Sequence, residues 1–180
     1  MPHARKLVAV SSHAALSRVV SGGQTGADRA ALDWAIAHGI AHGGWCPRGR
    51  LAEDGRIPLR YTLAETPSHD YAQRTRWNVR DSDGTLIISR AAVLTGGSEY
   101  TARCAERFGR PWLHAYPGAD SAAALLAFIA RHRIGTLNIA GPRLSNDAGI
   151  YDYALAVLGR LACGPSADKA SASSSASSGQ

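Results

Sequence analysis

Three glycine-rich stretches of this chain have the residue types that bind anions. They read SGGQTG at 21–26, TGGSEYT at 95–101 and AGPRLS at 140–145. Glycine adopts positive φ at little cost and lets neighbouring backbone N–H groups turn inward, and a helix that begins there adds the positive end of its dipole. These stretches predict a site for a phosphate or a similar small anion. The candidate contacts are Ser21, Gly22, Gly23, Gln24, Thr25, Gly26, Gly96, Gly97, Ser98 and Gly141.

Four arginines are candidates for charged contacts to the same ligand: Arg48, Arg74, Arg76 and Arg143. Guanidinium groups bind phosphate through paired N–H donors. Arg74 and Arg76 fall, together with Arg80, in the segment 71–83, which reads as a helix leading into a strand. Arginines on such a helix are also typical of a solvated face, and the acidic Asp81 and Asp83 could simply pair with them. The sequence leaves both interpretations open.

Some of these loop residues have a structural alternative as helix caps. Thr25 and Asp28 fit a capping box, in which the threonine caps the helix and the carboxylate reaches back. Ser98 or Thr101 could cap the second helix in the same way. Asn146 or Asp147 could cap the last one, by accepting hydrogen bonds from the first backbone N–H groups. Capping and ligand contact are competing interpretations of all of them.

The charge of the chain is positive but dispersed. The 20 basic Lys and Arg residues outnumber the 14 acidic ones, for a formal charge of +6, yet they form no run or stripe. We therefore expect a small phosphate-bearing ligand and no nucleic acid as partner. No apolar run approaches the roughly 18 residues that a membrane span needs, so no membrane partner is expected.

Several familiar site classes do not fit. Ser21 stands where the dinucleotide-binding fingerprint has its first glycine, and Cys46, Pro47 and Arg48 follow the second predicted strand where an acidic residue would bind the ribose. No P-loop motif is present. The three cysteines are far apart and the seven histidines lack ligand spacing, so we expect no metal site and no disulfide framework, and a cytoplasmic location. Cys46 reads as a small core residue.

The elements that must position these residues alternate between strand and helix. Short β-like runs occur at 17–21, 43–47, 84–89, 111–116 and 136–140, and most lack the alternation of a half-exposed strand. Helix-length segments with helical apolar spacing lie between most of them. We predict an α/β fold of the Rossmann-like three-layer type, with a mainly parallel sheet of about five or more strands and helices on both faces. The glycine loops would then meet at the carboxyl ends of the strands.

The chain divides into three parts by composition. We expect a flexible N-terminal extension at 1–16, a single domain at 17–163, and a disordered Ala/Ser-rich tail at 164–180. The longest aperiodic segment inside the domain is 47–67. Loops of this length in compact domains tend to be functional or mobile.

Together these motifs resemble a known family, the putative molybdenum carrier proteins within the LOG-like Rossmannoid superfamily. The resemblance runs from about Arg18 to Leu161, through SGGQTGADRAALDWA, GWCPRGRLAEDG, IPLRY, RTRWNVRDSDGTLI, TGGS and LNIAGPRLS. It implies a Rossmann-like fold, a phosphate-bearing nucleotide-like or molybdopterin ligand, and homo-oligomers. The molybdenum cofactor would then be a bound ligand, with its metal held by its own dithiolene.

The enzymes of that superfamily, the LOG phosphoribohydrolases, suggest an alternative. Arg74 has the spacing expected of their substrate-binding arginine, and Gly96 with Gly97 matches the glycine pair of their P-G-G-x-G-T-x-x-E motif. The remaining positions depart from the pattern: Thr95 replaces the proline, Glu99 the third glycine, and Ala102 or Arg103 the glutamate.

The sequence therefore supports three functional hypotheses. The first is a carrier that holds a molybdenum cofactor or a related nucleotide at the glycine loops. The second is a nucleoside-monophosphate phosphoribohydrolase in which Arg74 orients the substrate and Glu99 supplies the carboxylate. The third is a nucleotide sensor that changes partners on binding. Whether the protein is an enzyme stays open, and the carrier is the preferred reading.

Overall fold

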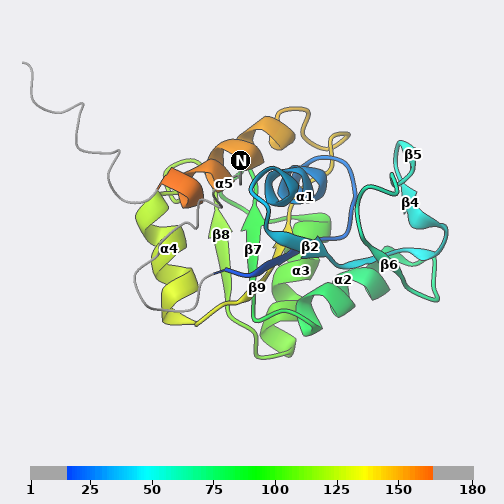
Figure 1. Ribbon diagram of the computed structural model, residues 1–180, viewed down its shortest axis with the longest axis horizontal. Helices are drawn as coiled ribbons and strands as arrows, with labels where there is room; N and C mark the ends of the chain where they lie inside the picture. The colour runs from blue at the N-terminus through cyan, green and yellow to red at the C-terminus, as the bar shows by residue number, and fades with distance from the viewer. Residues whose placement is uncertain (1–15, 164–180) are drawn as a thin grey trace, which may run out of the picture.

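The computed structural model describes residues 16–163, which form one α/β unit around a parallel sheet (Figure 1). The strand order is β2-β1-β9-β7-β8, and every neighbouring pair is parallel. The strands are β1 (Arg18–Val20), β2 (Ala41–Gly43), β7 (Gly84–Ile88), β8 (Trp112–Ala115) and β9 (Thr136–Ala140). The predicted Rossmann-like class with five or more strands and a parallel sheet is confirmed.

Helices cover both faces of this sheet. They are α1 (Ala27–Ala37), α2 (Tyr71–Arg80), α3 (Gly96–Arg107), α4 (Ala122–Arg131) and α5 (Ile150–Cys163). In Figure 1, α1 and α5 lie above the sheet, α4 lies to its left, and α2 and α3 lie below it. The buried apolar clusters agree, since the large one joins strand residues to α1, α4 and α5, and a small separate one joins α2 to α3.

The two faces of the sheet differ in chemistry. Leu137 and Ile139 of β9 point into the large apolar cluster together with Leu86 and Ile88 of β7. Alternate side chains of a strand point to opposite faces. Asn138 stands between Leu137 and Ile139 in β9, so its side chain points to the α2/α3 side of the sheet. Asn138 is 2% exposed. The sheet thus has an almost wholly apolar face and a partly polar one.

The prediction of the second strand at 43–47 was wrong in its bounds. The sheet strand is β2 (Ala41–Gly43), and β3 (Trp45–Cys46) pairs with β6 (Ala64–Glu65) in a separate two-stranded sheet. Gly44 separates them at φ 122, with its Cα packed against the backbone of Ser21. A side chain at this position would collide with that backbone, so the chain turns here at the only residue type that allows it.

The long aperiodic segment is an ordered excursion beside the sheet. It contains β3, the 3-10 turn η1 (Arg48–Arg50), the hairpin strands β4 (Leu51–Ala52) and β5 (Gly55–Arg56), and β6. Figure 1 shows it extending from the edge of the molecule beyond β2. A second apolar cluster holds it against α1 through Leu32, with Cys46 fully buried inside. This burial and packing confirm the expected core role of Cys46. Burial also raises the pKa of its thiol.

Among residues 16–163 no helix is long and apolar enough to cross a membrane. The N-terminal extension and the tail that the sequence predicts at 1–16 and 164–180 lie almost wholly outside the described residues.

Candidate functional site

The three glycine loops meet at one edge of the sheet. β9 lies between β1 and β7, and the chain leaves β1 toward β2 but leaves β7 in the opposite direction, toward β8. Such a switch point opens a crevice beyond the carboxyl ends of the strands, where ligands of doubly wound folds bind. Two adjoining cavities of about 280 Å³ and 530 Å³ lie there, and Tyr71, Arg74, Gly97 and Gly141 line both.

In the first loop, a side chain of the protein itself occupies the space that an anion would need. The Arg74 guanidinium lies directly over Gly22, so that a Cβ at residue 22 would fall 1.5 Å from Arg74 Nη1. That guanidinium donates to Asp28 Oδ2 over 2.9 Å, and the same carboxylate oxygen accepts from Gln24 N over 3.2 Å. The backbone N–H that an anion would use at Gln24 is therefore satisfied by Asp28. Gly22 makes room for an arginine.

The other two glycines of this loop also meet packing needs. Gly23, at φ 75, packs on Leu63 of the excursion, and Gly26, at φ 79, lies against the carbonyl of Pro142. Ser21 is fully buried and donates to Ile139 O over 2.7 Å, which ties the end of β1 to β9. In this loop the cavities are lined only by Gly22, in the smaller one, and by Gln24, in the larger.

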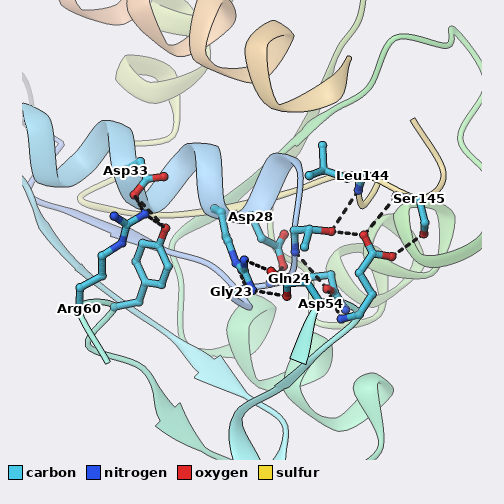
Figure 2. Close-up of polar contacts among 12 residues, drawn as sticks. Gly23, Gln24, Asp28, Asp33, Asp54, Arg60, Leu144 and Ser145 are labelled. Carbon is cyan, nitrogen blue, oxygen red and sulfur yellow. Dashed lines mark hydrogen bonds and ion pairs between the residues drawn. The ribbon is translucent and has the colours of Figure 1, made fainter. Parts of the chain in front are cut away.

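The capping box predicted for Thr25 and Asp28 is half right. The Asp28 carboxylate does reach back, as far as Gln24 N. Thr25 does not cap, because α1 begins after Gly26 and has no side-chain cap. Its hydroxyl instead donates to Glu53 and accepts from Leu144 N (Figure 2).

The second loop is open to the cleft. α3 begins at Gly96 after Thr95, and no side chain caps it, so the expected capping by Ser98 or Thr101 was wrong. The Thr101 hydroxyl donates instead to Gly97 O, over 2.8 Å. A Cβ at Gly97 would meet nothing within 4 Å, and its φ lies outside the left-handed region. Neither packing nor backbone conformation requires glycine at this position.

The third loop contributes Gly141 and Arg143. A Cβ at Gly141 would fall 2.2 Å from Ile88 O, so this glycine serves the packing of β9 against β7. Arg143 lines the larger cavity and lies 3.4 Å from the Glu53 carboxylate. At the end of the same loop, Asp147 accepts from Gly149 N over 3.1 Å, in a turn that precedes α5, and pairs with Arg90. This hydrogen bond lies outside the helix, so the capping interpretation of Asp147 stays a prediction.

Glu53, at the tip of the β4–β5 hairpin, fastens the first loop to the third. Its carboxylate accepts from the hydroxyls of Thr25 and Ser145 and from Ser145 N. Figure 2 labels Ser145 and the neighbouring Leu144 among these contacts. Burial acts to raise the pKa of Glu53, but the hydrogen bonds from Ser145 and Thr25 outweigh it and hold the pKa below its usual value. The hairpin therefore stabilises one wall of the cleft.

Three predicted site residues lie away from the cavities. Arg48 is exposed in η1, Arg76 donates to the Tyr100 hydroxyl over 2.9 Å, and Glu99 forms an ion pair with Arg103 along α3. None of the three lines either cavity. Asp81 pairs with Arg80, as expected, whereas the Asp83 carboxylate accepts from the backbone N–H groups of residues 135 and 136.

The cleft also contains residues that the sequence analysis did not select. Tyr71, at the start of α2, lines both cavities, and Asn138 lies in the floor of the smaller one. The sequence held a signal for Asn138, because an amide in the middle of the otherwise apolar run TLNIA is unusual for a strand covered on both faces. Tyr71 gave no such signal.

Comparisons with known proteins give a family and one solved relative. Residues 19–162 match the model of the circularly permutated YpsA SLOG family. A crystal structure of the putative molybdenum carrier protein from Syntrophus aciditrophicus SB, at 1.45 Å resolution, is 49% identical. It covers 83% of this chain and 96% of its own, with a TM-score of 0.78. No curated protein matches significantly. The family resemblance seen in the motifs is confirmed.

Proposed function

Because this chain belongs to the circularly permutated YpsA SLOG family, we propose that it binds a small phosphate-bearing ligand in the cleft. The relative that is named a molybdenum carrier, at 49% identity, supports the narrower proposal that the ligand is a molybdenum cofactor or a related nucleotide. The protein would then act as a carrier, with the metal chemistry supplied by the cofactor.

The open start of α3 is the observation that carries this proposal. Uncapped N–H groups of a helix and its dipole favour an anion. Gly96 and Gly97 leave the space above them open, and Ser98 lines the larger cavity next to them. Arg74 faces the same space, and its Nε is buried without a hydrogen-bond partner among residues 16–163. A phosphate there would meet backbone donors and a guanidinium together.

This placement changes the role proposed for each loop. The phosphate is assigned to α3 and Arg74, with Arg143 from the third loop at the far side of the larger cavity. The first loop, whose backbone donor at Gln24 is taken by Asp28, orients Arg74 through that carboxylate. We no longer assign ligand contacts to Arg48 or Arg76, which do not line the cleft.

A phosphoribohydrolase is the second candidate, and one observation favours it. The chemistry needs a carboxylate near the sugar. Glu99 lies outside the cavities, but the Asp28 carboxylate lines the smaller one. Hydrolysis would release a free base from a nucleoside monophosphate, which separates this function from a carrier.

A matched pair of glycine variants tests the binding site. Gly97→Ala fills the space above the start of α3, whereas Gly159→Ala changes an open position on α5, away from the cleft. Both should raise the free energy of unfolding by about 0.4–1 kcal/mol, because alanine restricts the unfolded chain. Only Gly97→Ala should weaken binding of inorganic phosphate, AMP or purified molybdenum cofactor.

Unfolding measurements with each compound provide the readout. A ligand at about 100 times its Kd should add roughly 2.7 kcal/mol to the stability of the wild-type protein. Stabilisation by the cofactor without turnover supports the carrier. Free base released from AMP would establish the hydrolase instead, and equal binding by both glycine variants would refute the site at α3.

A further inference from the structure

The smaller cavity has a buried polar lining whose hydrogen-bonding capacity the fold only partly uses. It lies between the sheet and the helices α2 and α3, next to the start of α3. Asn138, Thr101 and Asp28 line it, and they are 2%, 3% and 3% exposed. Polar groups buried to this degree are costly unless they are hydrogen-bonded. The hydrogen-bonding atoms of these side chains that have no partner in the protein therefore indicate which ligand groups the cavity can bind.

Each of the three side chains retains an acceptor. Asp28 receives both of its hydrogen bonds on Oδ2. Asn138 uses Nδ2 to donate to the Thr85 hydroxyl over 3.2 Å, and Thr101 donates its own proton to Gly97 O. Within residues 16–163 no donor reaches Asp28 Oδ1, Asn138 Oδ1 or Thr101 Oγ1. The lining of the cavity thus offers three acceptors, one each from α1, α3 and β9.

The donors of the cleft lie next to these acceptors, since Arg74 donates to Asp28 and Thr101 contacts Gly97 at the start of α3. Arg74 and the N–H groups at the start of α3 border both cavities. A ligand that spans the boundary would place its anionic group against these donors. The group that enters the smaller cavity would meet the three acceptors, and only hydrogen-bond donors satisfy acceptors.

We propose that the smaller cavity binds a neutral group that carries at least two hydrogen-bond donors, with Asn138 as a specificity-determining residue. The proposal rests on the proposed anion site. Vicinal hydroxyls of a phosphorylated sugar and the N–H edge of a phosphorylated aminopterin both have this chemistry. At about 280 Å³ the cavity is close to the lower end of the range for small-ligand sites, roughly 300–1,000 Å³.

Calorimetric titration of the full chain with four probes tests the proposal. Inorganic phosphate reports on the anion site alone. Ribose 5-phosphate and 6-hydroxymethylpterin phosphate carry donors, and tetrahydrofurfuryl phosphate keeps a ring but lacks ring donors. We expect one donor-bearing ester to bind at least about tenfold tighter than the tetrahydrofurfuryl ester, because a ring without donors would displace water from the acceptors and leave them unpaired. The ester that does so identifies the source of the donors.

Variants then assign the preference to a residue. Asn138→Leu should abolish the tenfold preference and leave inorganic phosphate binding unchanged. Thr85→Val is the matched control, since Thr85 contacts Asn138 but does not line the cavity. If Asn138→Leu does not fold, Thr101→Val removes another acceptor with little change in shape and should reduce the preference.

The outcomes separate this inference from the proposed function. Equal affinities for the three esters, or an unchanged preference in both acceptor variants, would overturn the role of the smaller cavity while the anion site stands. If neither inorganic phosphate nor any ester binds the wild-type protein, the proposed function fails, and this inference fails with it.

Discussion

At the scale of single residues, Arg48 and Arg50 have different structural roles, although nothing in the sequence distinguishes these two neighbouring arginines. Arg50 is 5% exposed and donates to four backbone carbonyls of the excursion, those of residues 57, 58, 61 and 63. Its neighbour Arg48 is exposed and makes no side-chain hydrogen bond or ion pair with residues 16–163. Arg50 therefore ties the backbone of the excursion together, alongside the apolar cluster that holds this segment against α1.

Replacing Arg50 should show how much its hydrogen bonds contribute to the free energy of unfolding. Arg50→Met retains a long side chain but removes a donor from all four carbonyls and leaves those of residues 57 and 63 with none among residues 16–163. We expect it to lower the free energy of unfolding by about 3–5 kcal/mol. Arg48→Met is the control and should change it by less than about 0.5 kcal/mol. Urea unfolding of both variants provides the measurement, and similar stabilities would contradict the role assigned to Arg50.

At the scale of elements, α2 is the helix that brings Tyr71 and Arg74 to the cleft. Its start is fixed by Asp70, whose carboxylate accepts from Ala72 N over 2.9 Å. The helix α4 has the equivalent cap, in which Ser121 accepts from Ala124 N over 3.2 Å, but none of its residues lines either cavity. The two helices thus differ in function while they share a capping device.

Removing each cap should separate stability from binding. Asp70→Ala and Ser121→Ala should each lower the free energy of unfolding by about 1 kcal/mol, the usual value for an N-cap. Only Asp70→Ala should also weaken phosphate binding, because fraying of the first turn of α2 displaces Tyr71 and Arg74. Titration calorimetry at a temperature where both variants are folded measures this. Unchanged affinity in Asp70→Ala would argue against α2 as a wall of the site.

At the scale of the whole molecule, several elements are joined by carboxylates that the fold keeps ionised. Hydrogen bonds from arginines lower the pKa of Asp54 and Asp81. For Glu53 and Asp120, burial acts to raise the pKa, but hydrogen bonds to the carboxylate outweigh it and lower the pKa. The folded protein therefore holds fewer protons on these groups than the unfolded chain does in mildly acidic solution.

This difference predicts an acid-sensitive fold. A lowered pKa in the folded state contributes stability above the usual pKa, here 3.8 for Asp and 4.5 for Glu, and the contribution is lost as the pH falls through the folded value. The urea midpoint should thus fall steadily below about pH 5. Glu53→Gln should reduce this dependence. A midpoint that is constant between pH 6 and pH 3 would rule out the linkage.

The sequence alone determined the fold class and pointed to the region of the candidate site. Unalternating apolar runs predicted β7 and β9, apolar spacing predicted α1, α3 and α4, and the glycine loops marked the strand ends where the cleft lies. These features depend on local periodicity and on backbone freedom, which are properties of neighbouring residues. The second strand was misplaced because a single glycine at 44 divided a run that looked continuous.

Only the tertiary structure decided which loop is open and which is filled. Both loops have adjacent glycines ahead of a helix, and the sequence treats them alike. Gly22 is covered by an arginine from α2, and the donor at Gln24 is taken by Asp28, whereas the space above Gly97 is empty of protein. Gly22 and Arg74, which are in contact in the fold, are 52 positions apart in the sequence. Such a contact is set by the packing of α2 against the end of β1, and no local pattern encodes it.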